Sequence, residues 1–205
     1  MIMKNPESGR SMIEMLGVLA IVGVLSIGGL AGYAQAMQKY KVYKVSSQVA
    51  DTMQNVIKFY SNLETFDSVG TMAKKSKLNL AAFEYSKVDG STKLYHAFGG
   101  EAQVTECSRK AAGDKLAFCV ILKNVEQKGC AELMERSWGG RAFAIGAISS
   151  GTFTETQYLD LASNAGQVKK EGSSTVAYGS AIPLKAKDAA TACTGANNTF
   201  FVKVK

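Results

Sequence analysis

The sequence has few of the residues that enzyme active sites and metal centres most often use. Of its 205 residues only one is a histidine, His96, and no two of its four cysteines have C-x-x-C spacing. A single histidine nearly excludes Ser-His-Asp catalysis and multi-histidine metal sites. The sequence also lacks P-loop, G-x-S-x-G and H-E-x-x-H patterns. We therefore predict a protein that is not an enzyme, with no catalytic, cofactor-binding or metal-binding residues, and interpret His96 as an ordinary packing or surface residue.

Proline is also scarce, and neither of the two prolines, Pro6 and Pro183, lies between Arg10 and Leu63. Because proline breaks the interior of a helix, this stretch can form one uninterrupted helix. Residues 15–34 contain no charged side chain. As a helix, a block of that length spans roughly 30 Å, the thickness of a bilayer's hydrocarbon core. We predict that this block is a membrane anchor.

After the anchor, apolar residues recur at steps of three or four, which is the spacing of one helix face. They are Val42, Val45, Val49, Met53, Val56, Ile57, Tyr60 and Leu63. The other face is expected to be polar and exposed, with Gln38, Lys39, Lys41, Lys44, Ser46, Gln48, Asp51, Gln54, Asn55 and Lys58. The sequence thus predicts one helix over residues 10–62, roughly 80 Å long, whose part 35–62 is amphipathic.

A Sec signal peptide is a competing interpretation of the N-terminus. Lys4 would be its positive region, and Ala34-Gln35-Ala36 has the A-x-A form of a cleavage site. However, the apolar block is longer than the typical region of about 7–15 residues, and the cut would fall in the middle of the predicted helix. A secreted binding protein cleaved after Ala36 therefore remains the alternative from another functional class.

From residue 63 onwards the pattern predicts a separate α+β domain. Residues 64–92 are expected to form a loop region with a short helix near 78–83. Alternating, β-prone runs predict strands at 93–98, 102–107, 116–122, 141–148 and 199–204, with a turn at 109–114. A helix is predicted at 125–136, capped by Asn124 with Gln127 and ended by Gly139 and Gly140. We expect the amphipathic helix to pack on a largely antiparallel sheet.

The net charge of +7 comes from dispersed basic residues. The lysines include Lys39, Lys41, Lys44, Lys74, Lys75, Lys169, Lys170, Lys203 and Lys205. Such dispersion is typical of a solvated basic surface and disfavours a nucleic-acid partner without excluding one. The four cysteines, Cys107, Cys119, Cys130 and Cys193, lie behind an export-type segment and fit disulfides formed outside the cytoplasm. Three pairings are possible on the sequence alone.

One short segment resembles a known family. Gly9-Arg10-Ser11-Met12-Ile13-Glu14-Met15-Leu16 is similar to the prepilin processing motif of type IV pilins and related pseudopilins. In that family a membrane peptidase cuts after the glycine, the new N-terminal residue is methylated, and the fifth residue is glutamate. The resemblance implies a leader at 1–9, a cut between Gly9 and Arg10, and pairing of Glu14 with the N-terminal amine of Arg10 in a neighbouring subunit.

The sequence departs from the family's pattern at two places. Arg10 stands where the best-known pilins have phenylalanine and others have methionine or leucine. The helix also lacks the proline that is common at mid-span in the family, and Gly28 and Gly29 are expected to provide its soft point instead.

For the whole chain, the resemblance implies a type IVb-like pilin fold, with the helix 10–62 packed on an antiparallel β-sheet head at 63–205. It implies a disulfide between Cys130 and Cys193 that closes the C-terminal region, and hence one between Cys107 and Cys119. The implied function is that of a filament subunit that serves adhesion, motility, conjugation or DNA uptake, with a minor pilin or a type II secretion pseudopilin as the alternative. The implied partners are identical subunits, a prepilin peptidase with the assembly machinery, and the bacterial inner membrane before export into an extracellular pilus.

Overall fold

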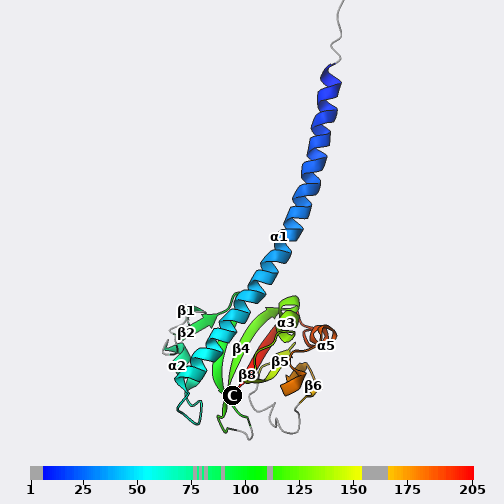
Figure 1. Ribbon diagram of the computed structural model, residues 1–205. Helices are drawn as coiled ribbons and strands as arrows, with labels where there is room; N and C mark the ends of the chain where they lie inside the picture. The colour runs from blue at the N-terminus through cyan, green and yellow to red at the C-terminus, as the bar shows by residue number, and fades with distance from the viewer. Residues whose placement is uncertain are drawn as a thin grey trace, which may run out of the picture. The chain divides into compact units, whose positions relative to one another are not determined.

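The computed structural model describes residues 7–75, 78, 80, 83–88, 91–109, 113–153 and 166–205. The chain divides into two units, Met1–Tyr40 and Lys41–Lys205. One continuous helix, α1 (Glu7–Phe59), begins in the first unit and ends in the second, and its 53 residues confirm the predicted long helix (Figure 1). The helix has no break at Ala36, in agreement with the apolar and amphipathic patterns that meet there.

The part of α1 that belongs to the second unit buries one stripe of side chains against the sheet. Val42, Val45, Val49 and Val56 are fully buried, and Met53 and Tyr60 nearly so. Two positions differ from the prediction. Gln48, expected on the exposed face, is buried because its Oε1 accepts a hydrogen bond from the Ala97 N–H at 3.3 Å. Leu63, expected in the stripe, is exposed because the helix has already ended.

The described part of the second unit contains one antiparallel sheet of eight strands. These are β1 (Glu84–Val88), β2 (Ser91–Tyr95), β3 (Glu101–Cys107), β4 (Ala117–Glu126), β5 (Ala142–Ile148), β6 (Val168–Glu171), β7 (Ser174–Tyr178) and β8 (Asn197–Val204). Their order across the sheet is β1-β2-β3-β4-β8-β5-β7-β6. The last strand in the chain therefore lies in the middle, hydrogen-bonded to β4 on one side and β5 on the other.

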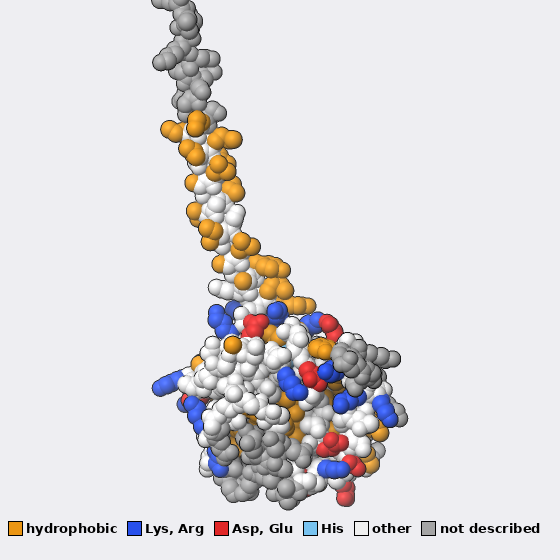
Figure 2. Space-filling model, turned by 180° about the vertical axis from the view of Figure 1, so that it is seen from behind, with side chains coloured by type: hydrophobic (Ala, Val, Ile, Leu, Met, Phe, Trp, Pro, Cys, Tyr) orange, Lys and Arg blue, Asp and Glu red, His pale blue; other side chains and the backbone are white. Residues whose placement is uncertain are grey.

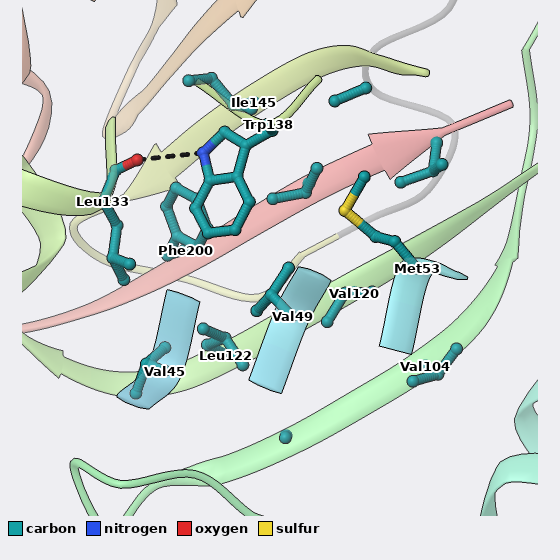
Figure 3. Packing of buried hydrophobic residues seen from close by; sticks show 14 of the residues in the cluster. Val45, Val49, Met53, Val104, Val120, Leu122, Leu133, Trp138, Ile145 and Phe200 are labelled. Atoms are coloured by element: carbon teal, nitrogen blue, oxygen red, sulfur yellow. Dashed lines mark hydrogen bonds between the residues drawn. The ribbon is translucent and has the colours of Figure 1, made fainter. Parts of the chain in front are cut away.

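The two faces of the sheet carry two separate cores, because successive side chains of a strand point to opposite faces. On the α1 face, Phe200 and Val202 of β8 pack with Val120 of β4 and with the α1 stripe (Figure 3). On the other face, Phe201 packs with Ile121 and the smaller cluster around them. Lys203, assigned to the solvated surface from the sequence, is in fact buried, because both faces of this central strand are covered.

Three α-helices and a 3-10 turn accompany α1 in the described residues. They are α2 (Val69–Lys74), α3 (Gln127–Met134), α5 (Ala186–Ala192) and η2 (Gly179–Ala181). The predicted helix at 125–136 is confirmed only in its middle. The predicted cap is wrong: Val125 and Glu126 still pair with β8 after a bulge, and Asn124 has φ 58° within that strand. Glu126 is the N-cap residue and makes no side-chain capping bond.

The region predicted as a loop with a helix at 78–83 is organised differently. Its helix is α2, and the hairpin β1–β2 begins at Glu84. Of the predicted helix, Leu78, Leu80 and Phe83 are not helical, and the other residues lie outside the described part. The strand predicted at 93–98 ends at Tyr95, because a turn follows in which the Gly99 N–H donates to the His96 carbonyl oxygen at 2.8 Å.

Two disulfides cross-link the second unit. Cys107 and Cys119 join β3 to β4, with 5.7 Å between their Cα atoms. Cys130 on α3 and Cys193 at the end of α5 have Cα atoms 5.9 Å apart. These are the two pairs that the family resemblance implied, and the second pair closes the C-terminal region as expected.

Candidate functional site

The first unit exposes an apolar surface of unusual extent. Twelve of its large apolar side chains are each between 52% and 73% exposed: Met12, Ile13, Met15, Leu16, Val18, Leu19, Ile21, Val22, Val24, Leu25, Ile27 and Leu30. Figure 2 shows hydrophobic side chains on the face of this helix that it presents. Each such side chain left in water forfeits about 1.5–3 kcal/mol relative to full burial. Contiguous patches of this kind mark surfaces that enter a lipid or protein environment.

A membrane is one environment that this helix fits. It is the one helix of the described chain that is long and apolar enough to cross a bilayer, with a mean hydropathy of 2.2 over its most apolar 18 residues. None of that window is buried within the structure. The segment therefore has the length and composition of a membrane span, while its side chains stay available for other contacts.

The residues of the predicted processing and assembly site lie at the start of α1. Gly9 and Arg10 are in its first turns, and the Arg10 side chain lies outside the described part. Glu14 follows four residues after Arg10, on the same helix face, and its side chain is exposed. No hydrogen bond or ion pair involves the Glu14 side chain in the described residues. A carboxylate on an apolar helix must find a partner when it leaves water.

A groove that the sequence did not predict runs along the second unit's part of α1. Its volume is about 470 Å³. One wall is the α1 stripe that includes Tyr43, Met53 and Ile57, and the other is the segment 136–141 that follows α3. Gly139 and Gly140 were predicted from the sequence to end the helix, but α3 already ends at Met134. The two glycines instead lie in the second wall of the groove.

Trp138 fixes the second wall of the groove. Its indole is 7% exposed, and its Nε1–H donates a hydrogen bond to the Leu133 carbonyl oxygen at 3.1 Å (Figure 3). The ring also packs on Phe200, with 5.6 Å between ring centroids. The tryptophan thus holds the segment against the core, and Arg136 and Arg141 flank it at the groove.

His96 occupies a buried site at the turn between β2 and β3. Its Nε2 lies 2.8 Å from the Lys123 carbonyl oxygen, and its Nδ1 accepts a hydrogen bond from the Phe98 N–H at 3.3 Å. This arrangement fits the neutral ring protonated on Nε2. Burial lowers the pKa of His96 below its ordinary value, although the hydrogen bond to Lys123 opposes the shift. His96 is therefore a packing residue, one of the two roles expected for it.

Charged groups near this turn and near the end of α1 are mutually stabilised. Burial raises the pKa of Glu101, but hydrogen bonds from Gln103 and Lys123 and the charge of Lys123 outweigh it and leave the pKa lowered. The hydrogen bond and charge of Lys115 lower the pKa of Asp67. Neither arrangement resembles a pair of acids poised for proton transfer.

Within the described residues, no group of three or more His, Cys, Asp or Glu side chains is placed to hold a metal ion.

Comparison with known proteins identifies the architecture. No protein-family model matches the sequence, and no curated protein matches it. A type IVb pilin from Salmonella typhi has a similar structure, with a TM-score of 0.50 and 18% identity, over 77% of this chain and 95% of that one. TcpA, a type IV pilin from Vibrio cholerae El Tor, gives a TM-score of 0.53 and 15% identity, over 81% of this chain and 99% of that one. The chain thus has the type IV pilin fold, and the predicted fold class is confirmed.

Proposed function

We propose that the chain is the structural subunit of a bacterial type IV pilus, made as a membrane-anchored precursor and polymerised with identical copies into a surface filament. The observation that carries this proposal is the apolar half of α1, exposed over its whole described length and continuous with a folded pilin-type head. Such a helix buries its side chains in lipid before assembly and against copies of itself afterwards. The solved pilins share their fold with this chain, and we propose that the chain shares their function as well.

The strength of the anchor suits a subunit that must leave the membrane again. The block 15–34 contains nine Leu, Ile and Val residues. At about 0.3–0.6 kcal/mol each, they favour insertion by on the order of 3–5 kcal/mol together. This insertion free energy holds the helix in the inner membrane. Contacts between helices in a filament can replace it when the subunit leaves the membrane.

The first residues of the mature chain would set the register of the filament. A prepilin peptidase would cut between Gly9 and Arg10, remove the leader 1–9, and expose the amine of Arg10 for methylation. Within an apolar helix bundle, the carboxylate of Glu14 is stabilised by an opposite charge, and the amine of a neighbouring copy supplies one. This ion pair is most favourable when each copy is shifted along the filament axis so that its Glu14 carboxylate lies beside the Arg10 amine of the neighbouring copy.

The decisive experiment determines the N-terminus of the exported protein and its state of assembly together. Mass spectrometry of protein sheared from the cell surface should show a chain that begins at Arg10, and electron microscopy of the same sample should show filaments. Gly9→Ala is the matched control: its precursor should stay uncut in the membrane and form no filaments. An exported chain that begins at Met37, without α1's apolar half, would refute the proposal and support a Sec-secreted protein.

A further inference from the structure

The three arginines of the second unit lie in two adjoining pockets along α1 and at its end. Several described lysines have a carboxylate oxygen within 4 Å: Lys41, Lys44, Lys115 and Lys123. The three arginines, Arg109, Arg136 and Arg141, have no ion pair or side-chain hydrogen bond in the described residues. All three line either the groove along α1 or the neighbouring pocket at the end of that helix. Arginine is the preferred residue for pairing with carboxylates at protein interfaces, so a concentration of unpaired arginines indicates an acidic partner.

The groove combines this charge with an apolar floor. Its lining includes Arg136 and Arg141 and no acidic residue. Asp51 is not part of this lining, although it accepts a hydrogen bond at 3.3 Å from Ser47, which is. The wall formed by α1 extends from Tyr43 to Ile57, a length of about 21 Å at 1.5 Å per residue. A complementary surface would therefore be elongated, with an aromatic or aliphatic side chain beside a carboxylate.

The opposite flank of the same unit carries such a surface. On β1, the side chain of Glu84 is 79% exposed, and its one ion pair is a long contact of 3.8 Å to Lys44. The next residue, Tyr85, is 36% exposed. At 100° per residue, Lys44 and the groove stripe lie on opposite sides of the buried stripe of α1. Figure 1 accordingly shows β1 and β2 on one side of α1 and α3 on the other.

We propose that the groove along α1 receives β1, the edge strand of the sheet, from a second copy of this chain, with Glu84 between Arg136 and Arg141 and Tyr85, on the other face of that strand, against the α1 wall of the groove. The inference rests on the proposed function and specifies where neighbouring heads meet. Both surfaces lie at the level of the same turns of α1, so copies with parallel helices bring them together side by side. Because the contact joins two different patches, each copy can pass it on to the next, and the stagger proposed for Glu14 would keep the resulting array open and helical.

A charge exchange tests this contact in the full-length protein expressed in cells. Arg136→Glu with Arg141→Glu should reduce filaments at least tenfold, and Glu84→Arg should do the same. The combination of all three changes should restore filaments to within about threefold of wild type, because the ion pairs re-form with reversed polarity. Lys187→Glu, on the exposed face of α5, is the matched charge reversal away from both surfaces and should leave assembly unchanged.

The outcomes separate this contact from the wider proposal. If the wild type forms no filaments, the proposed function fails. If the wild type polymerises and the reversals have no effect, or folded variants are not rescued in combination, the groove does not receive β1. Folding is checked by the retention of both disulfides. As a second measurement, a photo-reactive phenylalanine at position 85 should cross-link to 43–57 or 136–141 of another copy, distinguished by mixing isotope-labelled and unlabelled subunits. Cross-links confined to other segments would also overturn the contact.

Discussion

The ring of His96 ties the turn between β2 and β3 to β4, because its Nε2 lies 2.8 Å from the carbonyl oxygen of Lys123. The main chain of Gly100 also lies against this carbonyl group. A Cβ added at Gly100 would be only 1.8 Å from the same oxygen, which is a clash. Gln48 of α1 joins the arrangement through its hydrogen bond to the Ala97 N–H. Helix, turn and strand thus meet at one buried polar site, which makes two predictions possible.

The first prediction concerns pH. The folded-state pKa of His96 lies below its value of 6.5 in the unfolded chain, so the unfolded state binds the proton more readily. The free energy of unfolding should therefore be unaffected by His96 above about pH 6.5 and fall as the pH drops below it, by up to about 1.4 kcal/mol per pH unit until the folded pKa is reached. Urea unfolding of the full chain in detergent at pH 7.5 and pH 5.5 measures the difference.

Because the chain has one histidine, His96→Gln is a clean control for this step. The glutamine amide can still donate a hydrogen bond to the Lys123 carbonyl, but it does not titrate. The variant should lose less stability than wild type between pH 7.5 and pH 5.5. Equal losses in the two proteins would show that His96 does not cause the pH dependence.

The second prediction concerns Gly100. A methyl group added at Gly100 would clash with the carbonyl oxygen of Lys123. Because this oxygen belongs to the main chain of β4 and not to a flexible side chain, β4 itself would have to move. Gly100→Ala should reduce the free energy of unfolding by about 3 kcal/mol or more. Gly140→Ala is the matched control, because nothing lies within 4 Å of a Cβ there. Urea unfolding should separate the two variants clearly, and similar curves would contradict the close approach.

The third prediction ranks the disulfides. Cys130 and Cys193 are 63 residues apart, whereas Cys107 and Cys119 are 12 apart. In the chain-entropy model the longer loop contributes about 4 kcal/mol and the shorter one about 3 kcal/mol. Replacing each pair by alanines should therefore cost more for the first pair. Unfolding curves of the two double variants provide the test, and the reverse order would show that strain or residual structure dominates.

The sequence was sufficient to predict the elements whose periodicity is long. The helix α1 has more than a dozen turns of consistent spacing, and local deviations such as Gln48 do not alter it. The strands from β3 to β5 also agreed with their alternating or apolar runs to within a few residues. Glu14, Gly9 and Arg10 were found by motif, and their predicted roles in processing and assembly stay predictions.

Other features depend on contacts that periodicity does not encode. The insertion of β8 between β4 and β5 is a pairing of strands far apart in the sequence, and only that position explains the burial of Lys203. The sequence around Asn124 predicts a helix N-cap, but β4 continues to pair with β8 beyond this residue. The strands β6 and β7 are short and lie in a polar, glycine-containing region, so they gave no signal distinct from a loop.

The fourth prediction contrasts two apolar side chains of α1. Met53 is 6% exposed and belongs to the core of the second unit, whereas Leu25 is 69% exposed in the first unit. Met53→Ala should lower the free energy of unfolding by about 2–3 kcal/mol through the cavity it leaves. Leu25→Ala should leave unfolding unchanged but reduce filament yield, because in the proposed filament its side chain would be buried only between copies. A loss of stability in Leu25→Ala would mean that its part of the helix packs within one chain.

The last prediction concerns Glu14, which carries the proposed register of the filament. Glu14→Gln preserves the size of the side chain and most of its hydrogen bonding but removes the charge, so a neighbour's amine would be left without its counter-ion. If charge pairing determines the stagger, Glu14→Gln and Glu14→Ala should both reach the membrane and be cut after Gly9, yet form at least tenfold fewer filaments. Immunoblots of membrane and sheared fractions measure both steps.

The comparison of the two Glu14 variants distinguishes charge from hydrogen bonding. Filaments in Glu14→Gln but not in Glu14→Ala would indicate that a hydrogen bond suffices, whereas normal assembly of Glu14→Ala would contradict any role of this side chain in register. Asp188→Asn, an exposed acid on α5, is the matched control and should assemble like wild type. Co-expression with wild-type copies adds a final distinction: a subunit that cannot pair its own carboxylate still offers its amine, so it should enter mixed filaments in limited numbers rather than stop their growth altogether.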